Sequence, residues 1–308
     1  MLEIDELSVR LPHTARPAID GISLTVAENE TVGLVGESGS GKSLTARAVL
    51  GLLPAAALTA GRILMDGADV LRMSPAALRR HRTHGAAMIY QDPRAAISPF
   101  RRIGDFLTEI LREELGARAA RARAVELLGL VGLPEPERHV RQHPHELSGG
   151  MLQRVVIAAA LAGEPRLVLA DEPTTALDVT TQAEIIRLLR DLRARTAAGM
   201  LFITHDLELA AMICDRVYVM YAGRIMETGP TRRLFADPRH PYTSGLLAAT
   251  PRVSDLGALP PAIPGRPPDL LTALPGCPFA PRCAHVTESC TAAAPSLADG
   301  VACVKAGS

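Results

Sequence analysis

Residues 36–43, with the sequence GESGSGKS, restrict the fold of this chain more than any other segment. Apolar residues 31–35 predict a strand directly before them, and residues 44–53 predict a helix directly after. Three glycines let backbone amides converge on one point, and the positive end of the helix faces that point. The segment predicts an α/β fold with a phosphate-binding loop.

The loop predicts a nucleotide site with a bound cation. Lys42 would place a mobile positive charge on the phosphates, and the hydroxyl of Ser43 would bind Mg²⁺. Only Lys42 and Lys305 among the 33 basic residues are lysine, which argues against a chance lysine in a glycine-rich turn. The predicted nucleotide-binding residues are Gly36, Glu37, Ser38, Gly39, Ser40, Gly41, Lys42, Ser43 and Leu44.

Two carboxylates follow the apolar run at 167–170 and predict the catalytic centre. Asp171 suits a Mg²⁺ ligand acting through water, and Glu172 suits a general base for the attacking water. The alternative is an ordinary acidic cap at the start of the next helix. His205 also follows a predicted strand. A lone histidine is more often structural, but ligands of parallel sheets bind at this end of the strands.

The remaining patterns predict a mixed β core. Residues 1–30 alternate apolar and polar side chains, as in an antiparallel β layer, and residues 100–133 carry two helical patterns. Apolar runs at 167–170, 200–204 and 217–221 alternate with helical stretches, which predicts a largely parallel sheet. The segment from Pro241 onwards holds 11 of the 24 prolines and predicts a separate, loop-rich extension.

Charge and hydropathy exclude several classes of protein. The 33 basic and 33 acidic residues cancel, so no overall field attracts nucleic acid. The longest uncharged stretch near the start, residues 48–61, is broken by Pro54 and too short for a membrane helix. The acidic start MLEIDELSVR is unlike a signal peptide, so we expect a cytoplasmic protein.

The motifs GESGSGKS, YQD at 90–92, LSGGM at 147–151, LADEPTTALD and ITHD resemble those of ABC transporter ATPases, in the same order, over roughly residues 1–240. The resemblance implies a P-loop ABC-type nucleotide-binding domain with a helical subdomain at about 92–160. It implies that Gln91 senses the nucleotide, contacts Mg²⁺ and couples to the permease, and that His205 contacts the γ-phosphate. It also implies that the signature residues Leu147, Ser148, Gly149, Gly150 and Met151 act in trans, and that Ala176, Leu177 and Asp178 form a dimer loop.

The resemblance extends to a subgroup. HPHELSGGMLQR, QDPRAAISP, HPYTSGLL and CPFAPRC are similar to segments of dipeptide and oligopeptide importer ATPases. This implies a second, homologous ATPase, two membrane permease subunits, an external solute-binding protein and a place at the cytoplasmic face of the membrane. The family's aromatic adenine platform is absent here, and counting back from Gly36 places His13 near that position.

Cys277, Cys283, Cys290 and Cys303 cluster in the extension at 241–308. A disulfide framework does not suit a reducing cytoplasm, which leaves zinc, an iron–sulfur cluster or four plain thiols. The spacings match neither zinc knuckles nor ferredoxins. The resemblance to importer ATPases with such an extension favours a 4Fe-4S cluster, with zinc as the alternative.

We therefore expect an ATPase that drives peptide import. Alternatives are an importer ATPase for a nickel complex or glutathione, a soluble ABC ATPase acting on DNA or in translation, and a nucleotide-binding regulator. The soluble class usually carries a long coiled-coil insertion or two cassettes, and neither pattern is present in this sequence. A nucleotide-binding regulator without turnover is disfavoured, because it would not require Lys42, Glu172 and His205 and all three are present.

Overall fold

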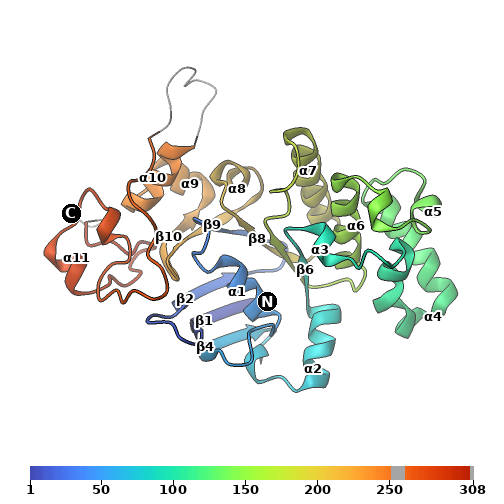
Figure 1. The fold of residues 1–308 in the computed structure, drawn as a ribbon, viewed down its shortest axis with the longest axis horizontal. Coiled ribbons are helices and arrows are strands. Elements are labelled where there is room, and N and C mark those ends of the chain that lie inside the picture. Colours follow the sequence, from blue (N-terminus) through green and yellow to red (C-terminus); the bar gives the residue numbers. More distant parts are fainter. Residues whose placement is uncertain (251–260, 306–308) are drawn as a thin grey trace. The chain divides into compact units, whose positions relative to one another are not determined.

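The computed structural model describes residues 1–250 and 261–305 of the chain. Contacts divide the chain into two compact units (Figure 1). Unit 1 comprises Met1–Val26, Glu30–Arg72 and Phe202–Ser308, and unit 2 comprises Ala27–Asn29 and Met73–Leu201. No described helix is both long and apolar enough to cross a bilayer.

An antiparallel β layer forms the start of unit 1. Its strand order is β2-β1-β4-β5, with β1 at Leu2–Arg10, β2 at Ile19–Val26, β4 at Leu58–Met65 and β5 at Ala68–Asp69. Leu2, Ile4 and Leu7 of β1 are buried and pair with Val26, Leu24 and Ile22 of β2, with a register shift between Ile4 and Leu7 where the alternation slips by one residue. The expected antiparallel layer is confirmed, and β4 is a strand that the sequence patterns did not predict.

The second sheet begins in unit 1 with the order β10-β9-β3-β8. Strand β3 (Thr31–Val35) is fully buried and runs parallel to β9 (Arg216–Tyr221), and β10 (Arg224–Pro230) pairs antiparallel with β9. The helices of this unit are α1 (Lys42–Val49), α8 (Leu207–Ile213), α9 (Thr231–Ala236), α10 (Pro241–Ala249) and α11 (Glu288–Ala292), with 3-10 turns η1 (Val70–Arg72) and η5 (Ala280–Arg282).

Unit 2 contains the rest of this sheet and the helical part of the chain. The sheet continues as β8-β7-β6, with β6 at Ala86–Ile89 parallel to β7 at Leu167–Asp171. Strand β8 (Gly199–Thr204) is shared, because the unit boundary falls after Leu201. The helices are α2 (Pro75–Arg80), α3 (Pro93–Ala96), α4 (Ile103–Leu130), α5 (Pro136–His139), α6 (Gly149–Leu161) and α7 (Val179–Arg195), with η2 (His81–Gly85) and η3 (Pro144–Glu146).

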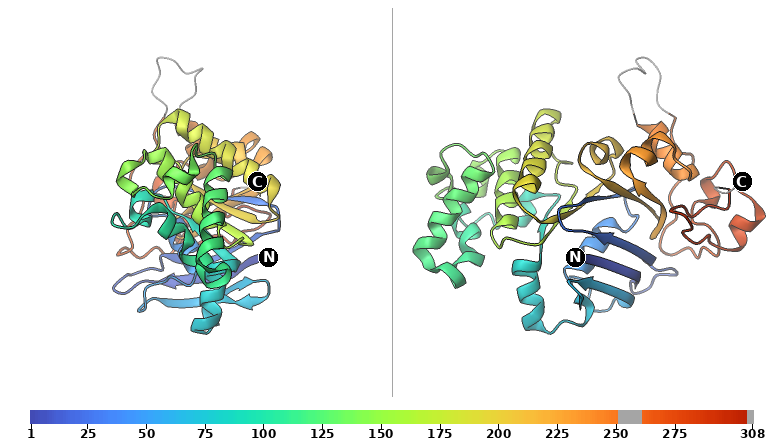
Figure 2. Two further views of the ribbon diagram at one scale, coloured as in Figure 1. Left: turned by 90° about the vertical axis from the view of Figure 1, so that its right-hand side faces the viewer. Right: turned by 180° about the vertical axis from the view of Figure 1, so that it is seen from behind.

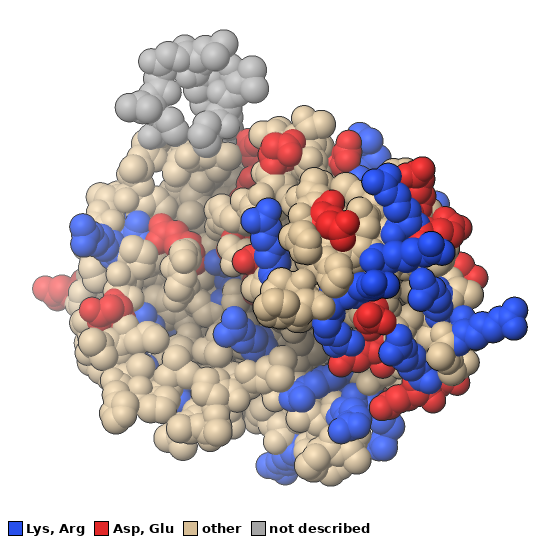
Figure 3. Space-filling view, turned by 45° about the vertical axis from the view of Figure 1, so that its right-hand side comes forward, with Lys and Arg blue, Asp and Glu red and all other residues tan. Residues whose placement is uncertain are grey.

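The two helical patterns predicted at 100–133 form one element, α4, which kinks where Gly116 adopts φ 73°. Helix α4 packs against α5 and α6, and Figure 2 shows this cluster from two further sides. The surface of α4 carries charges of both signs, and several of them form ion pairs. Arg112 pairs with Asp105, and Arg123 pairs with Glu126 and Glu164. Blue and red side chains are likewise mixed on the right-hand part of the face drawn in Figure 3.

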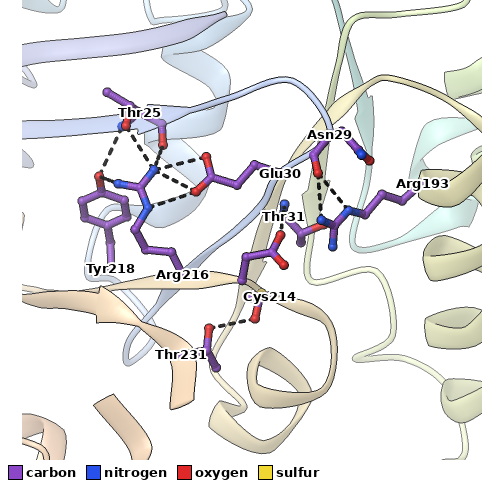
Figure 4. A network of polar contacts seen from close by, with 10 residues as sticks. Thr25, Asn29, Glu30, Thr31, Arg193, Cys214, Arg216, Tyr218 and Thr231 are labelled. Carbon is purple, nitrogen blue, oxygen red and sulfur yellow. Dashed lines mark hydrogen bonds and ion pairs between the residues drawn. The ribbon is translucent and has the colours of Figure 1, made fainter. Parts of the chain in front are cut away.

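A polar network fixes the entry to β3 within unit 1. The guanidinium of Arg216 contacts the carboxylate of Glu30 at 3.0 Å, the hydroxyl of Tyr218 at 2.7 Å and the carbonyl of Thr25 at 3.0 Å (Figure 4). The backbone N–H of Thr31 donates to Asp215 at 2.8 Å. These contacts hold the chain ends of β2, β3 and β9 in register.

Candidate functional site

The phosphate-loop motif lies in unit 1, between β3 and α1, as the sequence predicts. Gly41 adopts φ 108° at the N-terminus of α1, a conformation that residues with a Cβ rarely adopt. A Cβ on Gly36 would lie 2.0 Å from the carbonyl oxygen of Met220 on β9. The loop therefore passes too close to the sheet for any residue other than glycine at position 36.

Lys42 turns back over the loop that precedes it. Its side chain is buried, and its ammonium donates hydrogen bonds to the carbonyls of Gly36 at 2.7 Å and Glu37 at 2.9 Å. Ser43 and Leu44 follow in the first turn of α1, the end of the helix that carries partial positive charge. A lysine ammonium and the N-terminus of a helix at one glycine loop suit the binding of a polyphosphate.

Glu37 connects this loop to the C-terminal extension. Its backbone N–H donates to the hydroxyl of Tyr242 at 2.9 Å, and its carboxylate accepts hydrogen bonds from both terminal nitrogens of Arg282 at 2.7 and 3.1 Å. Burial by itself would lower the pKa of Arg282, but hydrogen bonds to Glu37 and Tyr221 and their charges outweigh it and raise this pKa. Burial raises the pKa of Tyr242. The extension thus packs on the loop.

His13 lies in the loop between β1 and β2, where it is exposed with φ 61°. This loop is also tied to the extension, because Arg16 donates to the carbonyls of Asp269 at 2.9 Å and Pro268 at 2.9 Å. The backbone N–H of Ala15 adds a bond of 2.9 Å to the carbonyl of Leu270. Burial lowers the pKa of Arg16.

Glu172 lies in unit 2, one residue after β7, with φ 46°. Its carboxylate oxygen Oε2 accepts hydrogen bonds from the side-chain amide of Gln91 at 3.1 Å and the hydroxyl of Thr175 at 2.9 Å. Asp171, on β7, is buried. The structure therefore brings Gln91 and Glu172 together.

The remaining motifs of unit 2 begin helices. Ser148 is exposed and caps α6, accepting a hydrogen bond from the backbone N–H of Met151 at 3.3 Å. Asp178 caps α7 in the same way through Thr181 at 3.0 Å, and that backbone hydrogen bond lowers the pKa of its carboxyl. Exposed serine and two glycines at a helix start offer backbone N–H groups to an anion.

His205 lies in unit 1, directly after β8, and its side chain is exposed. The next residue, Asp206, caps α8 by accepting hydrogen bonds from the backbone N–H groups of Glu208 at 2.8 Å and Leu209 at 3.1 Å. The histidine is therefore presented by a fixed turn at the carboxyl end of a buried strand, where the sequence predicts it.

The four cysteines of the extension line one small cavity of about 20 Å³. Burial raises the pKa of the Cys277 and Cys283 thiols, whereas a hydrogen bond from Thr287 lowers the pKa of Cys290. Within residues 1–250 and 261–305, no group of three or more His, Cys, Asp or Glu side chains is arranged to hold a metal ion. The thiols share a space without converging on one point.

Sequence reasoning missed three residues that support these sites: Tyr242, Arg282 and Thr175. The first two lie in the segments HPYTSGLL and CPFAPRC, which carried the resemblance, but their contacts with Glu37 span 205 and 245 residues. No local pattern reports such a contact. Thr175 lies three residues after Glu172, so a search for short-range hydrogen-bond partners could have found it.

Comparison with known proteins identifies the group. Residues 19–175 match the ABC transporter family, and residues 226–290 match the C-terminal region of oligopeptide and dipeptide transporters. The chain belongs to the ABC transporter family. Within it, the chain is 45% identical to the oligopeptide transport ATP-binding protein OppD of Salmonella typhimurium, over 96% of this chain and 89% of the relative.

Two more relatives place this ABC ATPase in the same group. The dipeptide transport ATP-binding protein DppD of Bacillus subtilis is 46% identical over 89% of this chain and 83% of its own length. The OppD protein of Mycobacterium tuberculosis is 47% identical over 97% of this chain, but the chain spans only 50% of that relative.

Solved structures agree with the ABC fold. The ATP-binding cassette MJ0796, in a dimeric post-hydrolysis state bound to ADP and phosphate, matches with a TM-score of 0.66 and 26% identity, over 75% of this chain and 99% of its own. A subunit of the cbiONQ transporter from Clostridium perfringens, cbiO1, matches with a TM-score of 0.67 and 27% identity, over 77% and 90%. The predicted P-loop ABC ATPase fold is confirmed.

Proposed function

We propose that this ABC-family chain hydrolyses Mg-ATP and drives the import of peptides. The observation that carries the proposal is the buried Lys42 ammonium, bonded to the carbonyls of its own glycine loop at the start of α1. Ser38, Gly39 and Ser40 lie in the loop and Leu44 lies in the first turn of α1, and these residues would bind phosphate through backbone amides. His13 is the proposed neighbour of the adenine.

Hydrolysis would transfer the γ-phosphoryl group to water. The water oxygen attacks the γ-phosphorus while its proton passes to the Glu172 carboxylate, and the bond to the β-phosphate oxygen breaks to release ADP. The hydrogen bonds from Gln91 and Thr175 fix the carboxylate that receives the proton. His205 would contact the departing phosphate.

Mg²⁺, when bound, would neutralise charge on the phosphates, with Ser43, Gln91 and Asp171 as its proposed protein contacts. Ser43 opens α1 and carries a hydroxyl, and Asp171 is a buried carboxyl at the end of a strand. These are oxygen donors of the kind that Mg²⁺ prefers.

The exposed helix start at Ser148 is proposed to act on a nucleotide held by another ATPase subunit. The signature residues are Leu147, Ser148, Gly149, Gly150 and Met151, and the proposed dimer loop is Ala176, Leu177 and Asp178. The exposure of Ser148 and Asp178 supports this proposal. We propose that the partner is a homologous but different ATPase.

The match of residues 226–290 to oligopeptide and dipeptide transporters supports peptides as the transported solute. The proposed assembly adds two permease subunits and an external solute-binding protein, with this chain at the cytoplasmic face of the membrane. We propose an ATPase domain at 1–240, with a helical subdomain at about 92–160, and an extension at 241–308.

For the extension we propose a 4Fe-4S cluster bound by Cys277, Cys283, Cys290 and Cys303. The donor set is suitable, because four thiols from distant positions line one cavity. A bound cluster would join parts of a segment with few large apolar side chains and stabilise it. Anaerobic purification should give brown protein containing iron and sulfide, and colourless protein with one zinc would refute the cluster.

The proposed function is tested with the Glu172→Gln variant in the complete transporter. Glutamine keeps the size of the side chain but accepts no proton, so Mg-ATP hydrolysis should fall about 1,000-fold while ATP binding persists. Hydrolysis of the unaltered transporter should increase when a peptide-loaded binding protein is added. Normal turnover in Glu172→Gln would refute the assignment of the base, and stimulation only by a nickel complex or glutathione would refute peptide as the solute.

A further inference from the structure

Two buried side chains of the extension, those of Tyr242 and Arg282, contact the phosphate loop at Glu37. Arg282 is 8% exposed and lies in η5, next to Cys283. Its guanidinium contacts the Glu37 carboxylate through both terminal nitrogens, the Tyr221 hydroxyl at 3.2 Å and the carbonyl of Pro264 at 2.8 Å. A planar guanidinium with several donors is suited to fix all three groups together.

Glu37 is the point at which these contacts meet the nucleotide machinery. Its carboxylate accepts hydrogen bonds from Arg282, and its backbone N–H donates to the hydroxyl of Tyr242. Its carbonyl accepts a hydrogen bond from the Lys42 ammonium at 2.9 Å. A displacement of Glu37 would therefore move a partner of Lys42. Tyr242, Tyr221 and Phe279 pack ring to ring at 4.6 to 5.4 Å and hold the same side of the loop.

The charge of Glu37 gives Arg282 a second effect. A carboxylate inside a loop that binds a polyphosphate repels its ligand, and the repulsion is strong where solvent is partly excluded. Arg282 neutralises that carboxylate from the side of the extension. The extension also holds the loop that carries His13, through the bonds of Arg16 to Asp269 and Pro268, so it contacts two segments with predicted nucleotide-binding residues.

We propose that Arg282 is a positioning residue for nucleotide binding, which holds and neutralises Glu37 so that the loop accepts the phosphates of ATP. This inference rests on the proposed function, because it requires ATP to bind at residues 36–44. It assigns to the C-terminal extension a direct role in the affinity for ATP.

The test measures ATP affinity by calorimetry on the full chain, in the Glu172→Gln background that prevents turnover. Arg282→Gln leaves an uncompensated carboxylate at the loop and should raise the Kd about tenfold. Glu37→Gln removes the charge that repels the phosphates but keeps a side-chain oxygen that can accept from Arg282, so its Kd should rise less than that of Arg282→Gln. The double variant should resemble Glu37→Gln, because the charge that Arg282 offsets is then gone.

Unit 1 offers a matched control in the pair of Arg216 and Glu30, which also includes a tyrosine hydroxyl (Figure 4). Arg216→Gln should lower the melting temperature about as much as Arg282→Gln does, with an unchanged Kd for ATP. If Arg282→Gln does not fold, Arg282→Lys replaces it. Lysine keeps the charge but loses the two-nitrogen contact, and it should raise the Kd about threefold.

Two results would overturn the inference. One is an Arg282→Gln or Arg282→Lys variant with the Kd of its parent, and the other is a double variant that binds ATP more weakly than Arg282→Gln. Failure of the proposed function looks different, because the parent chain itself would then show no binding of ATP. Rescue in the double variant supports compensation of charge, which a merely structural arginine would not produce.

Discussion

The phosphate loop and the cysteine cavity are two sites in unit 1 with opposite construction. The loop uses backbone groups of one continuous strand, turn and helix, and Lys42 already bonds to carbonyls of its own turn. The cavity uses four side chains spread over 27 residues that include the short helices η5 and α11, and these side chains share a space without a metal-binding arrangement. A site made of local backbone is organised by folding alone, whereas a site made of distant side chains requires a ligand to organise it.

The largest expected effect concerns the phosphate loop. Lys42→Ala removes the charge that the loop directs at the phosphates, so the Kd for ATP should rise at least about 100-fold. Calorimetry with ATP on the full chain measures it, and Arg47→Ala, on the same helix, is the control. An unchanged affinity for ATP in Lys42→Ala would contradict the view that the loop directs the charge of Lys42 at the phosphates.

The pH dependence of stability tests the wall of the cysteine cavity. His240 is buried beside it, and burial lowers its pKa from 6.5 to about 4. As the pH falls, the imidazole of His240 is therefore protonated in the unfolded chain before it is protonated in the folded chain. Stability should be full above pH 6.5 and should fall by about 2 kcal/mol between pH 7 and 5. Urea unfolding of metal-free protein measures it, with His240→Gln as the reference. An identical decline in that variant would remove the assignment to His240.

The smallest expected effect is that of the cysteine cavity on the affinity of the phosphate loop for ATP. Replacement of all four cysteines of the extension by serine should abolish the proposed cluster and loosen η5, yet Arg282 keeps its bonds to Pro264 and Tyr221. The Kd for ATP should therefore rise by no more than about threefold. Calorimetry on the variant and on metal-loaded parent protein measures the ratio. A loss as large as that in Lys42→Ala would mean that the loop is not organised independently of the extension.

Short-range patterns predicted much of the fold. Period-two alternation found β1 and β2, and apolar runs found β3, β7, β8 and β9. The edge strand β10 and the strands β4 and β6 were missed, because they are short or carry polar and glycine residues such as Arg62 and Gly61 in β4. Their strand form depends on hydrogen bonds to neighbours far away in the sequence, such as those between β4 and β1.

The sequence by itself determined the strand, glycine loop and helix that carry Lys42, the acidic end of β7 and the helix start at Ser148. Each is encoded within one continuous stretch of chain, the longest being residues 31–49, because local backbone conformation decides its geometry. Only the tertiary structure decided that the cysteine-rich extension lies against the phosphate loop, with Arg282 on Glu37 across 245 residues. Such a contact depends on where the packed core places two distant segments, and side-chain patterns along the chain carry no record of it.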